Sequence, residues 1–532
     1  MDIKNLSFPS SVLIFSFSSS IVTFTMRLEP VIGLEIHIQL KTTTKMFCGC
    51  KAHEEALAPN THVCPVCMGH PGALPVPNEA AIRDGILMGL ALGCQIAPQT
   101  KFDRKHYFYP DLPKAYQISQ FDLPLASKGS LEMEIPDTTA PRQKMTVEIT
   151  RVHMEEDAGK LFHGEGGRSY VDFNRGGVPL IEIVTEPDFR TPQEAKLFLQ
   201  ELRTMTRFLG ISDADMEKGH LRCDANISLR PIDEEGNLTG AQFYPKTEVK
   251  NINSFRFVER ALTFEIERQT KCWEARNPPQ EETTRGWNEV KQITEEQRSK
   301  EASNDYRYFP EPDIPLLHLA KLAEEMKTKL PELPARRRAR FVEEFGLKKE
   351  DARALCEDVS WANYVESVFA ELSTWIQDVE DLSEDQALVE RHRLANLVAN
   401  WMLNRLKGLM AERAIDIRIL KITPENFAEF ITLVATRKVN QATGTKLLTQ
   451  MMETGSDPSH IMEDKKMGTM EDVEVLAEIV ERVLQGHREE VLRYQQGKKE
   501  LLAFFIGLVM KETEGTADAA AVRNLLLVKL ET

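Results

Sequence analysis

The residues best suited to chemistry lie in a stretch of alternating polar and apolar side chains, Val31–Leu40. Its polar members Glu35, His37 and Gln39 share one face of a predicted strand, because successive side chains of a strand point to opposite faces. A carboxylate and an imidazole that project the same way suit a shared cation or a phosphate-bearing substrate. The pattern also fits a half-exposed strand whose polar face meets water, so this stretch alone leaves both interpretations open.

Three further groups add oxygen and nitrogen atoms. A second alternating stretch places Arg222, Asp224 and Asn226 on one face. Glu182 stands alone among aliphatic neighbours, and a carboxylate buried in a strand needs a cation or hydrogen-bond donors. An acidic run lies at Glu155–Asp157, although such runs are also typical of solvated turns. Together these side chains offer the ligands that Mg²⁺ accepts.

Four cysteines are grouped within one segment: Cys48, Cys50, Cys64 and Cys67. Their spacing is that of a four-thiolate zinc site, which is structural because four thiolates leave no open position on the metal. Two disulfides or unrelated buried thiols are the alternatives. With 8 cysteines in 532 residues, the chain does not have the composition of a disulfide scaffold.

The length of the chain predicts more than one hydrophobic core, and the pattern predicts an α+β fold. Short strands with glycine and proline punctuation occupy 26–315, and helical patterns follow. Thr423 is expected to cap a helix with Pro424 at its first position. We therefore expect a β-rich domain over 26–315, a helical domain over 316–422 and a helical tail over 423–532.

The formal net charge of −16 argues against indiscriminate polyanion binding, although Arg336–Arg340 forms a local basic run. Residues 1–25 match neither a secretory signal nor a transit peptide well. We expect them to be an N-terminal extension, with translation starting at Met26, or a leader. No later segment is apolar for about 18 residues, so we expect a soluble cytoplasmic protein without a membrane span, or an organellar one if the extension is a leader.

Several common motifs are absent from the sequence. It has no GxxxxGK[ST] loop, no GxGxxG after a strand, no serine-containing amidase signature and no GxSxG elbow. The sequence alone therefore does not indicate a nucleotide-binding site. Because it also lacks an amidase signature, another chain must produce any ammonia that the protein uses.

Read in order, the motifs resemble the B-subunit family of the aspartyl/glutamyl-tRNA(Asn/Gln) amidotransferases. The segments that carry the resemblance are Val31–Leu40, Lys101–Gln120, His153–Lys160, Asp172–Asp188, Leu221–Pro231, Lys246–Phe255 and Asn304–Asp313. They follow the family's order through the first three-fifths of the chain. The stretch from Gly497 to Gly515 resembles the family's tail domain.

The resemblance implies an antiparallel cradle, a helical bundle and a tail that binds tRNA. It implies a heterotrimer with a glutaminase (A) subunit and a small C subunit. In this family, ATP phosphorylates the side-chain carboxylate of Glu-tRNA(Gln) or Asp-tRNA(Asn), and ammonia displaces the phosphate to give Gln-tRNA(Gln) or Asn-tRNA(Asn). The family pattern assigns the magnesium ligands to Glu35, His37, Glu156 and Glu182, which argues against the solvated-face interpretation of the first two.

The segment from Lys105 through Tyr107 to Tyr109 interleaves basic and aromatic side chains. This composition suits stacking on unpaired bases and binding phosphate, as the CCA end of a tRNA requires, although the tyrosines would also fit a hairpin packed on the core. The resemblance adds a role for Lys105 and Tyr107 along the ammonia route. We also expect Arg222, Asp224 and Asn226 to contact the substrate.

The four cysteines match a zinc-bearing branch of the family, and members without them indicate that zinc is not needed for the chemistry. The competing hypothesis is a non-enzymatic tRNA-binding factor, in which the polar strand faces form an RNA platform. Such a factor would bind tRNA without any dependence on ATP.

Overall fold

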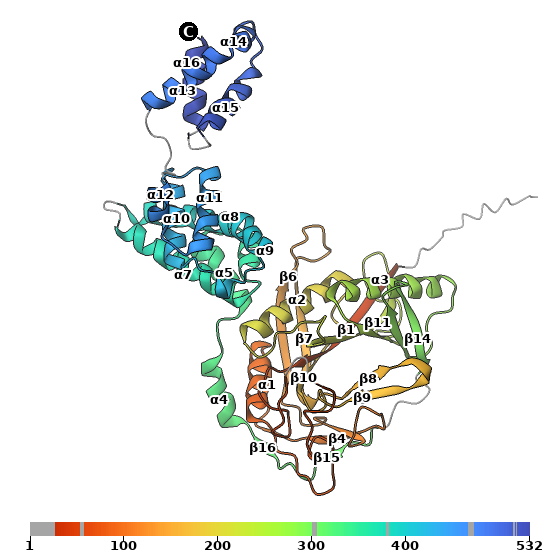
Figure 1. The fold of residues 1–532 in the computed structure, drawn as a ribbon. Coiled ribbons are helices and arrows are strands. Elements are labelled where there is room, and N and C mark those ends of the chain that lie inside the picture. Colours follow the sequence, from red (N-terminus) through yellow and green to blue (C-terminus); the bar gives the residue numbers. More distant parts are fainter. Residues whose placement is uncertain are drawn as a thin grey trace, which may run out of the picture.

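The computed structural model describes residues 27–53, 58–299, 306–378, 382–465, 473–513, 517 and 519–531. The expected extension, residues 1–25, lies outside the described residues, as do Asn304 and Asp305 of the motifs above. The α+β prediction is confirmed: a large sheet with its helices precedes an all-helical half (Figure 1). Within the described ranges, no helix is long and apolar enough to cross a membrane.

The first domain is built on a nine-stranded sheet in which β12 and β13 alone pair in parallel among the described strand pairs. In order across the sheet, the strands are β14 (Ile293–Ser299), β13 (Thr283–Asn288), β12 (Thr247–Ile252), β11 (Leu221–Ile232), β1 (Arg27–Gln39), β10 (Pro179–Thr185), β7 (Lys144–Glu156), β6 (Ala126–Glu134) and β2 (Gln95–Ile96). The two predicted alternating stretches are therefore neighbours, β1 and β11, at the middle of the sheet.

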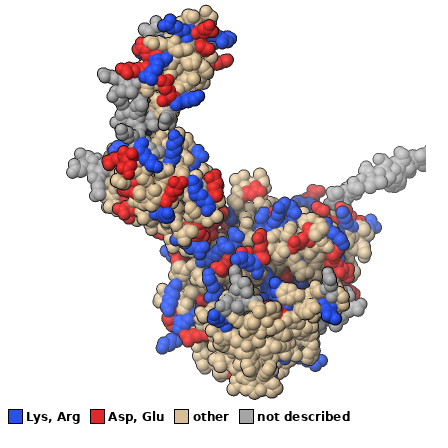
Figure 2. Space-filling view, viewed as in Figure 1, with Lys and Arg blue, Asp and Glu red and all other residues tan. Residues whose placement is uncertain are grey.

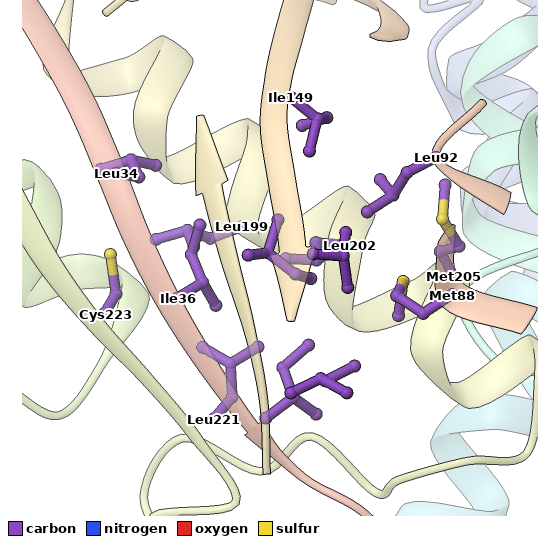
Figure 3. Packing of buried hydrophobic residues seen from close by; sticks show 14 of the residues in the cluster. Leu34, Ile36, Met88, Leu92, Ile149, Leu199, Leu202, Met205, Leu221 and Cys223 are labelled. Carbon is purple, nitrogen blue, oxygen red and sulfur yellow. The ribbon is translucent and has the colours of Figure 1, made fainter. Parts of the chain in front are cut away.

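One face of this sheet is apolar because its central strands alternate. Ile36 and Ile38 of β1 are fully buried under helices α1 (Glu79–Ala91), α2 (Pro192–Phe208) and α3 (Phe255–Glu274). Figure 3 shows Leu34 and Ile36 grouped with Leu199 and Leu202 of α2. Burial of each such side chain contributes about 1.5–3 kcal/mol, so the register of β1 is strongly fixed and its polar residues must face the other way.

Short strands complete the domain. They are β3 (Gln99–Thr100), β4 (Asp103–His106), β5 (Tyr116–Ser119), β8 (Lys160–His163), β9 (Ser169–Asp172), β15 (Phe309–Pro310) and β16 (Leu317–His318), with one 3-10 turn at Glu165–Gly167. In Figure 1 the β8–β9 hairpin and the β4–β5 hairpin lie on the side of the sheet away from α2 and α3. These hairpins therefore lie on the same side of the sheet as its polar face.

The helical half contains two separate cores. The helices are α4 (Ala320–Lys329), α5 (Pro334–Phe345), α6 (Lys349–Leu355), α7 (Val359–Asp378), α8 (Glu384–Trp401), α9 (Lys407–Glu412), α10 (Pro424–Ala435), α11 (Gln441–Thr454), α12 (Pro458–Lys465), α13 (Val473–Gly486), α14 (Arg488–Gln495), α15 (Leu501–Glu512) and α16 (Ala519–Glu531), with a π turn at Met402–Leu406 and a 3-10 turn at Ile417–Ile419. One core is formed by residues of α5 through α12, and the other is formed by residues of α13 through α16.

These cores divide the chain at different places from the expected boundaries. Thr423 does cap α10, accepting a hydrogen bond from the Asn426 amide with Pro424 at the first position. However, Phe427 and Phe430 of α10 are buried in the core that α7 and α8 also form. The helical half therefore divides between residues 465 and 473, because a cap marks where a helix begins and not which core it joins. Similarly, α4 packs on the core of the sheet domain.

The basic run at Arg336–Arg340 is used mainly for internal contacts. Arg338 Nη2 lies 2.6 Å from Glu201 Oε1 of α2, and Arg340 Nη2 lies 2.6 Å from Glu366 Oε1 of α7. Arg337 pairs with the same Glu366. The run therefore links α5 to the rest of the protein and is not an open basic track for RNA.

Candidate functional site

The polar face of the sheet gathers titratable side chains from four adjacent strands. Across β11, β1, β10 and β7, the register pairs Arg222 with His37, His37 with Glu182, and Glu182 with His153. Directly paired residues of antiparallel strands project from the same face. The next row pairs Glu35 with Asp224, so the two predicted polar strand faces form one continuous surface.

At the centre of this surface lie Glu35, His37, His153, Glu155 and Glu182, which we call the His37 cluster. His37 Nε2 is 3.4 Å from Glu182 Oε2, 3.5 Å from Glu155 Oε1 and 3.9 Å from Glu35 Oε1. His153 Nε2 is 3.2 Å from the same oxygen of Glu182. Ligand atoms of the cluster approach within 4.8 Å of one another in two overlapping sets that share Glu182. The arrangement therefore has the donors and the dimensions of a metal site.

The electrostatics of the cluster favour a cation. Burial alone would lower the pKa of His37, but its hydrogen bond with Glu182 and the charges of Glu155, Glu182 and Glu35 raise it to about 9. Burial and the nearby Glu182 raise the pKa of Glu35 above its usual range. Burial would also raise the pKa of Glu182, but the two histidines hold it well below its ordinary value. Three close carboxylates thus favour positive charge at this point, whether a proton on His37 or a bound cation.

Glu156 does not belong to the His37 cluster, although the family pattern includes it. It follows Glu155 on β7 and therefore projects from the opposite face. There its Oε1 pairs with the Lys114 ammonium and accepts a hydrogen bond from the Ile118 amide at 2.9 Å. Glu156 also lines a cavity of about 200 Å³ beside Cys67. The structure therefore brings together Glu35, His37 and Glu182, and puts Glu155 where Glu156 was expected.

Sequence reasoning missed His153, and it placed Glu155 in an acidic run without assigning it to the site. Both are buried, and they precede Glu156 in one of the segments that carry the family resemblance. The signal that identifies them is the alternation of His153, Met154, Glu155 and Glu156: if Met154 enters the core, then its two neighbours share the polar face and Glu156 does not.

Known protein families and relatives match this chain over most of its length. A family model described as the GatB/GatE catalytic domain matches residues 30–325, and one described as a GatB domain matches residues 385–530. The B subunit of the aspartyl/glutamyl-tRNA(Asn/Gln) amidotransferase from Thermotoga maritima is 45% identical over 513 residues, which cover 95% of this chain and 100% of the relative. The chain belongs to the amidotransferase B-subunit family. The protein of the same name from Crocosphaera subtropica is 43% identical over 505 residues, covering 93% of this chain and 96% of the relative.

In this member of the B-subunit family, an aromatic and basic wall borders the His37 cluster. Lys105 Nζ lies 5.1 Å from the centre of the Tyr306 ring, and Tyr107 packs edge-on against Tyr306 with ring centres 6.0 Å apart. Tyr308 packs against Tyr306 and stacks on Phe121. Burial would lower the pKa of Lys105 and raises that of Tyr107, and the charge of Glu155 raises the pKa of both, so the two side chains lie near the cluster. Sequence reasoning missed the two tyrosines that complete the wall, because they come from a segment distant in the sequence.

The other predicted contact residues differ in their surroundings. Tyr109 is 56% exposed. Arg222 Nη2 pairs with Asp157 Oδ1 at 3.0 Å, and Asp224 pairs with Lys250. The Asn226 side-chain oxygen is buried with no hydrogen-bond partner among the described residues. Arg222 and Asp224 are thus held beside His37 and Glu35 by ion pairs of their own.

The four grouped cysteines come together in space. Their Sγ atoms lie within 4.8 Å of one another, and those of Cys64 and Cys67 are 3.8 Å apart. Four thiolates around zinc at a Zn–S distance of about 2.3 Å would have Sγ atoms about 3.8 Å apart. Lys45 is 1% exposed, with its Nζ 4.0 Å from Cys67 Sγ. The residues therefore fit a tetrahedral zinc ion whose negative thiolate shell is partly compensated by a buried lysine.

Proposed function

We propose that this chain uses ATP to phosphorylate the side-chain carboxylate of Glu-tRNA(Gln), Asp-tRNA(Asn) or both, so that ammonia can convert it to an amide. Membership of the B-subunit family supports the proposal. The observation that carries it is the His37 cluster, three carboxylates and two histidines converging on one face of the sheet. A carboxylate anion is a poor electrophile, so amide formation at neutral pH requires its prior activation.

Different residues of the chain would bind the metal, orient its ligands and hold the tRNA. Glu35, His37, Glu155 and Glu182 would hold Mg²⁺, which neutralises and orients a transferring phosphoryl group when it is bound. The neighbouring His153 keeps Glu182 charged and fixes its orientation through the contact at 3.2 Å. The wall formed by Lys105, Tyr107, Tyr306 and Tyr308 would hold the acceptor end of the tRNA by stacking and by charge.

The same proposal includes the partners. Since the sequence has no amidase signature, a glutaminase (A) subunit would supply ammonia, and a small C subunit would complete a heterotrimer in the cytoplasm. Figure 2 shows few charged side chains on the lower face of the β-rich domain, around β4, β15 and β16. Phe309 of β15 is exposed, as are Phe108 and Tyr109, which follow β4 in the sequence. Such a surface suits a protein partner and the tRNA end better than it suits bulk water.

The experiment that tests the function is phosphate release from ATP by the chain assembled with its two partners. We expect stimulation by Glu-tRNA(Gln) or Asp-tRNA(Asn) and none by correctly charged Gln-tRNA(Gln). Tight tRNA binding without stimulation by either misacylated tRNA would contradict the proposal and support the non-enzymatic binding factor.

The tail is proposed to bind tRNA, and the extent of its hydrophobic core indicates where a C-terminal deletion should begin. Deletion after Lys465 removes α13 through α16 and leaves the preceding core complete, whereas deletion from Ser456 would also remove Ile461 from that core. We expect the shorter deletion to weaken tRNA affinity at least about tenfold, a loss of about 1.4 kcal/mol, while ATP turnover at saturating tRNA stays near normal. Filter binding and steady-state kinetics measure the two effects, and unchanged affinity would remove this role from the tail.

Zinc is proposed as a structural ion held by Cys48, Cys50, Cys64 and Cys67. We expect the purified chain to contain one zinc ion and the Cys64→Ser variant to lose it and to melt at a lower temperature, because metal binding contributes to folding. The matched control is Cys272→Ser, a cysteine outside the group. Metal analysis that finds full zinc content in Cys64→Ser would refute the assignment.

A further inference from the structure

The cations that surround the His37 cluster differ in whether they already have a partner. Arg222 is paired with Asp157, and Lys250 is paired with Asp224 and Glu248. These ion pairs neutralise the guanidinium and the ammonium locally, so neither group is fully available to an incoming anion.

Arg151 is different. On β7 it lies two residues before His153 and pairs across the sheet with Val184, which in turn pairs with Glu35. The register therefore puts Arg151 on the polar face, in the same row as Glu35 of the cluster. Within the described ranges its side chain has no hydrogen bond or ion pair, and its Nε is buried without a partner. A buried donor without an acceptor costs about 1–3 kcal/mol, so this position favours a ligand that accepts a hydrogen bond.

A second cation stands near the same place. Lys105 has no ion pair within the described part of the chain, and its ammonium rests over the Tyr306 ring. Burial alone would lower the pKa of Lys105, but the nearby Glu155, Tyr308 and Glu182 raise it, so the side chain stays charged. Burial raises the pKa of Tyr308, and the charges of Lys105 and Arg151 both act to lower it. Both cations therefore lie near enough to Tyr308 for their charges to act on it.

We propose that Arg151, together with Lys105, binds the terminal phosphate of ATP and the phosphoryl group of the acyl phosphate. This inference rests on the proposed function. In the transfer, a carboxylate oxygen forms a bond to phosphorus while the bond between phosphorus and the ADP oxygen breaks, and ADP keeps the electron pair. Arg151 forms no covalent bond. Its planar guanidinium donates hydrogen bonds to phosphate oxygens and neutralises their charge.

The test is ligand binding by the assembled complex, with Mg²⁺ and the non-hydrolysable β,γ-imido analogue of ATP as one probe and adenosine as the other. We expect Arg151→Met to weaken binding of the analogue roughly 10- to 100-fold, as loss of a charge-assisted hydrogen bond predicts, and to leave adenosine binding unchanged. Arg151→Lys should give an intermediate loss. The control is Lys144→Met, which removes a 77% exposed cation from the same strand and should bind both probes normally.

The outcomes separate this inference from the function on which it rests. If the unaltered complex does not bind the analogue with Mg²⁺, then the proposed function fails and the inference fails with it. If the unaltered complex binds and both Arg151 variants bind equally well, then Arg151 does not contact phosphate. An equal loss of adenosine binding would also overturn the assignment. Melting temperatures identify any misfolded variant, and if Arg151→Met does not fold, then Arg151→Lys decides.

Discussion

Replacing His37 by alanine is expected to abolish ATP-dependent amide formation on tRNA, with a loss of more than about 100-fold. His37 Nε2 lies within 3.9 Å of three carboxylates, so its removal leaves Glu35, Glu155 and Glu182 facing one another without the imidazole. The cluster then loses both a metal ligand and the group that compensates its charge. Conversion of Glu-tRNA(Gln) to Gln-tRNA(Gln) by the assembled complex measures the effect.

The control for this variant is His163→Ala, which removes an exposed histidine of the β8–β9 hairpin. It should retain amide formation. The His37→Ala complex should also retain the basal glutaminase activity of its partner, because that chemistry belongs to another chain. Normal amidation by His37→Ala would exclude the cluster as the activation site.

The second large effect is a contrast between two adjacent glutamates. Glu155→Gln is expected to weaken Mg²⁺ binding at least about tenfold, equivalent to about 1.4 kcal/mol, and to reduce ATP-dependent phosphate release in parallel, since its carboxylate faces His37. Glu156→Gln is expected to keep Mg²⁺ binding within a few-fold of normal. It should instead destabilise the first domain by about 3–5 kcal/mol, because it leaves the buried Lys114 ammonium without its carboxylate.

Calorimetric titration with Mg²⁺ and melting temperatures of the two variants measure this contrast. The two substitutions remove the same charge from neighbouring residues, so each is the matched control for the other. The reverse result, loss of Mg²⁺ binding in Glu156→Gln alone, would favour the family pattern over the geometry described above.

Part of the site could be predicted from local pattern. Strict alternation predicted that Glu35 and His37 share one face of β1 and that Arg222 and Asp224 share one face of β11. The structure makes these two faces continuous because the strands are neighbours. Alternation alone could not reveal that adjacency. The assignment of Glu156 came from the resemblance and not from the strand pattern, which favours Glu155 once Met154 is recognised as a core residue.

The organisation of the helices was harder to predict for a related reason. The cap at Thr423 is a local feature, formed with the residues that follow it, and it was predicted correctly. The core that Phe427 and Phe430 enter is built from α5 to α12 across more than a hundred residues of chain. Contacts of that kind depend on which helices meet in space, and so do the contacts of Tyr306 and Tyr308 with the distant Lys105 and Phe121.

The two ends of α2 belong to different cores. Leu199 and Leu202 pack under the sheet, whereas Phe208, the last residue of the helix, is buried in the core of α5 through α12. The guanidinium of Arg337 lies 6.0 Å from the centre of the Phe208 ring. A fragment that ends before α5 would expose this phenylalanine to water, and a fragment that begins at α5 would lack it. The sheet domain and the bundle of α5 through α12 are therefore joined through α2, and separating them is expected to leave apolar surface exposed on both fragments.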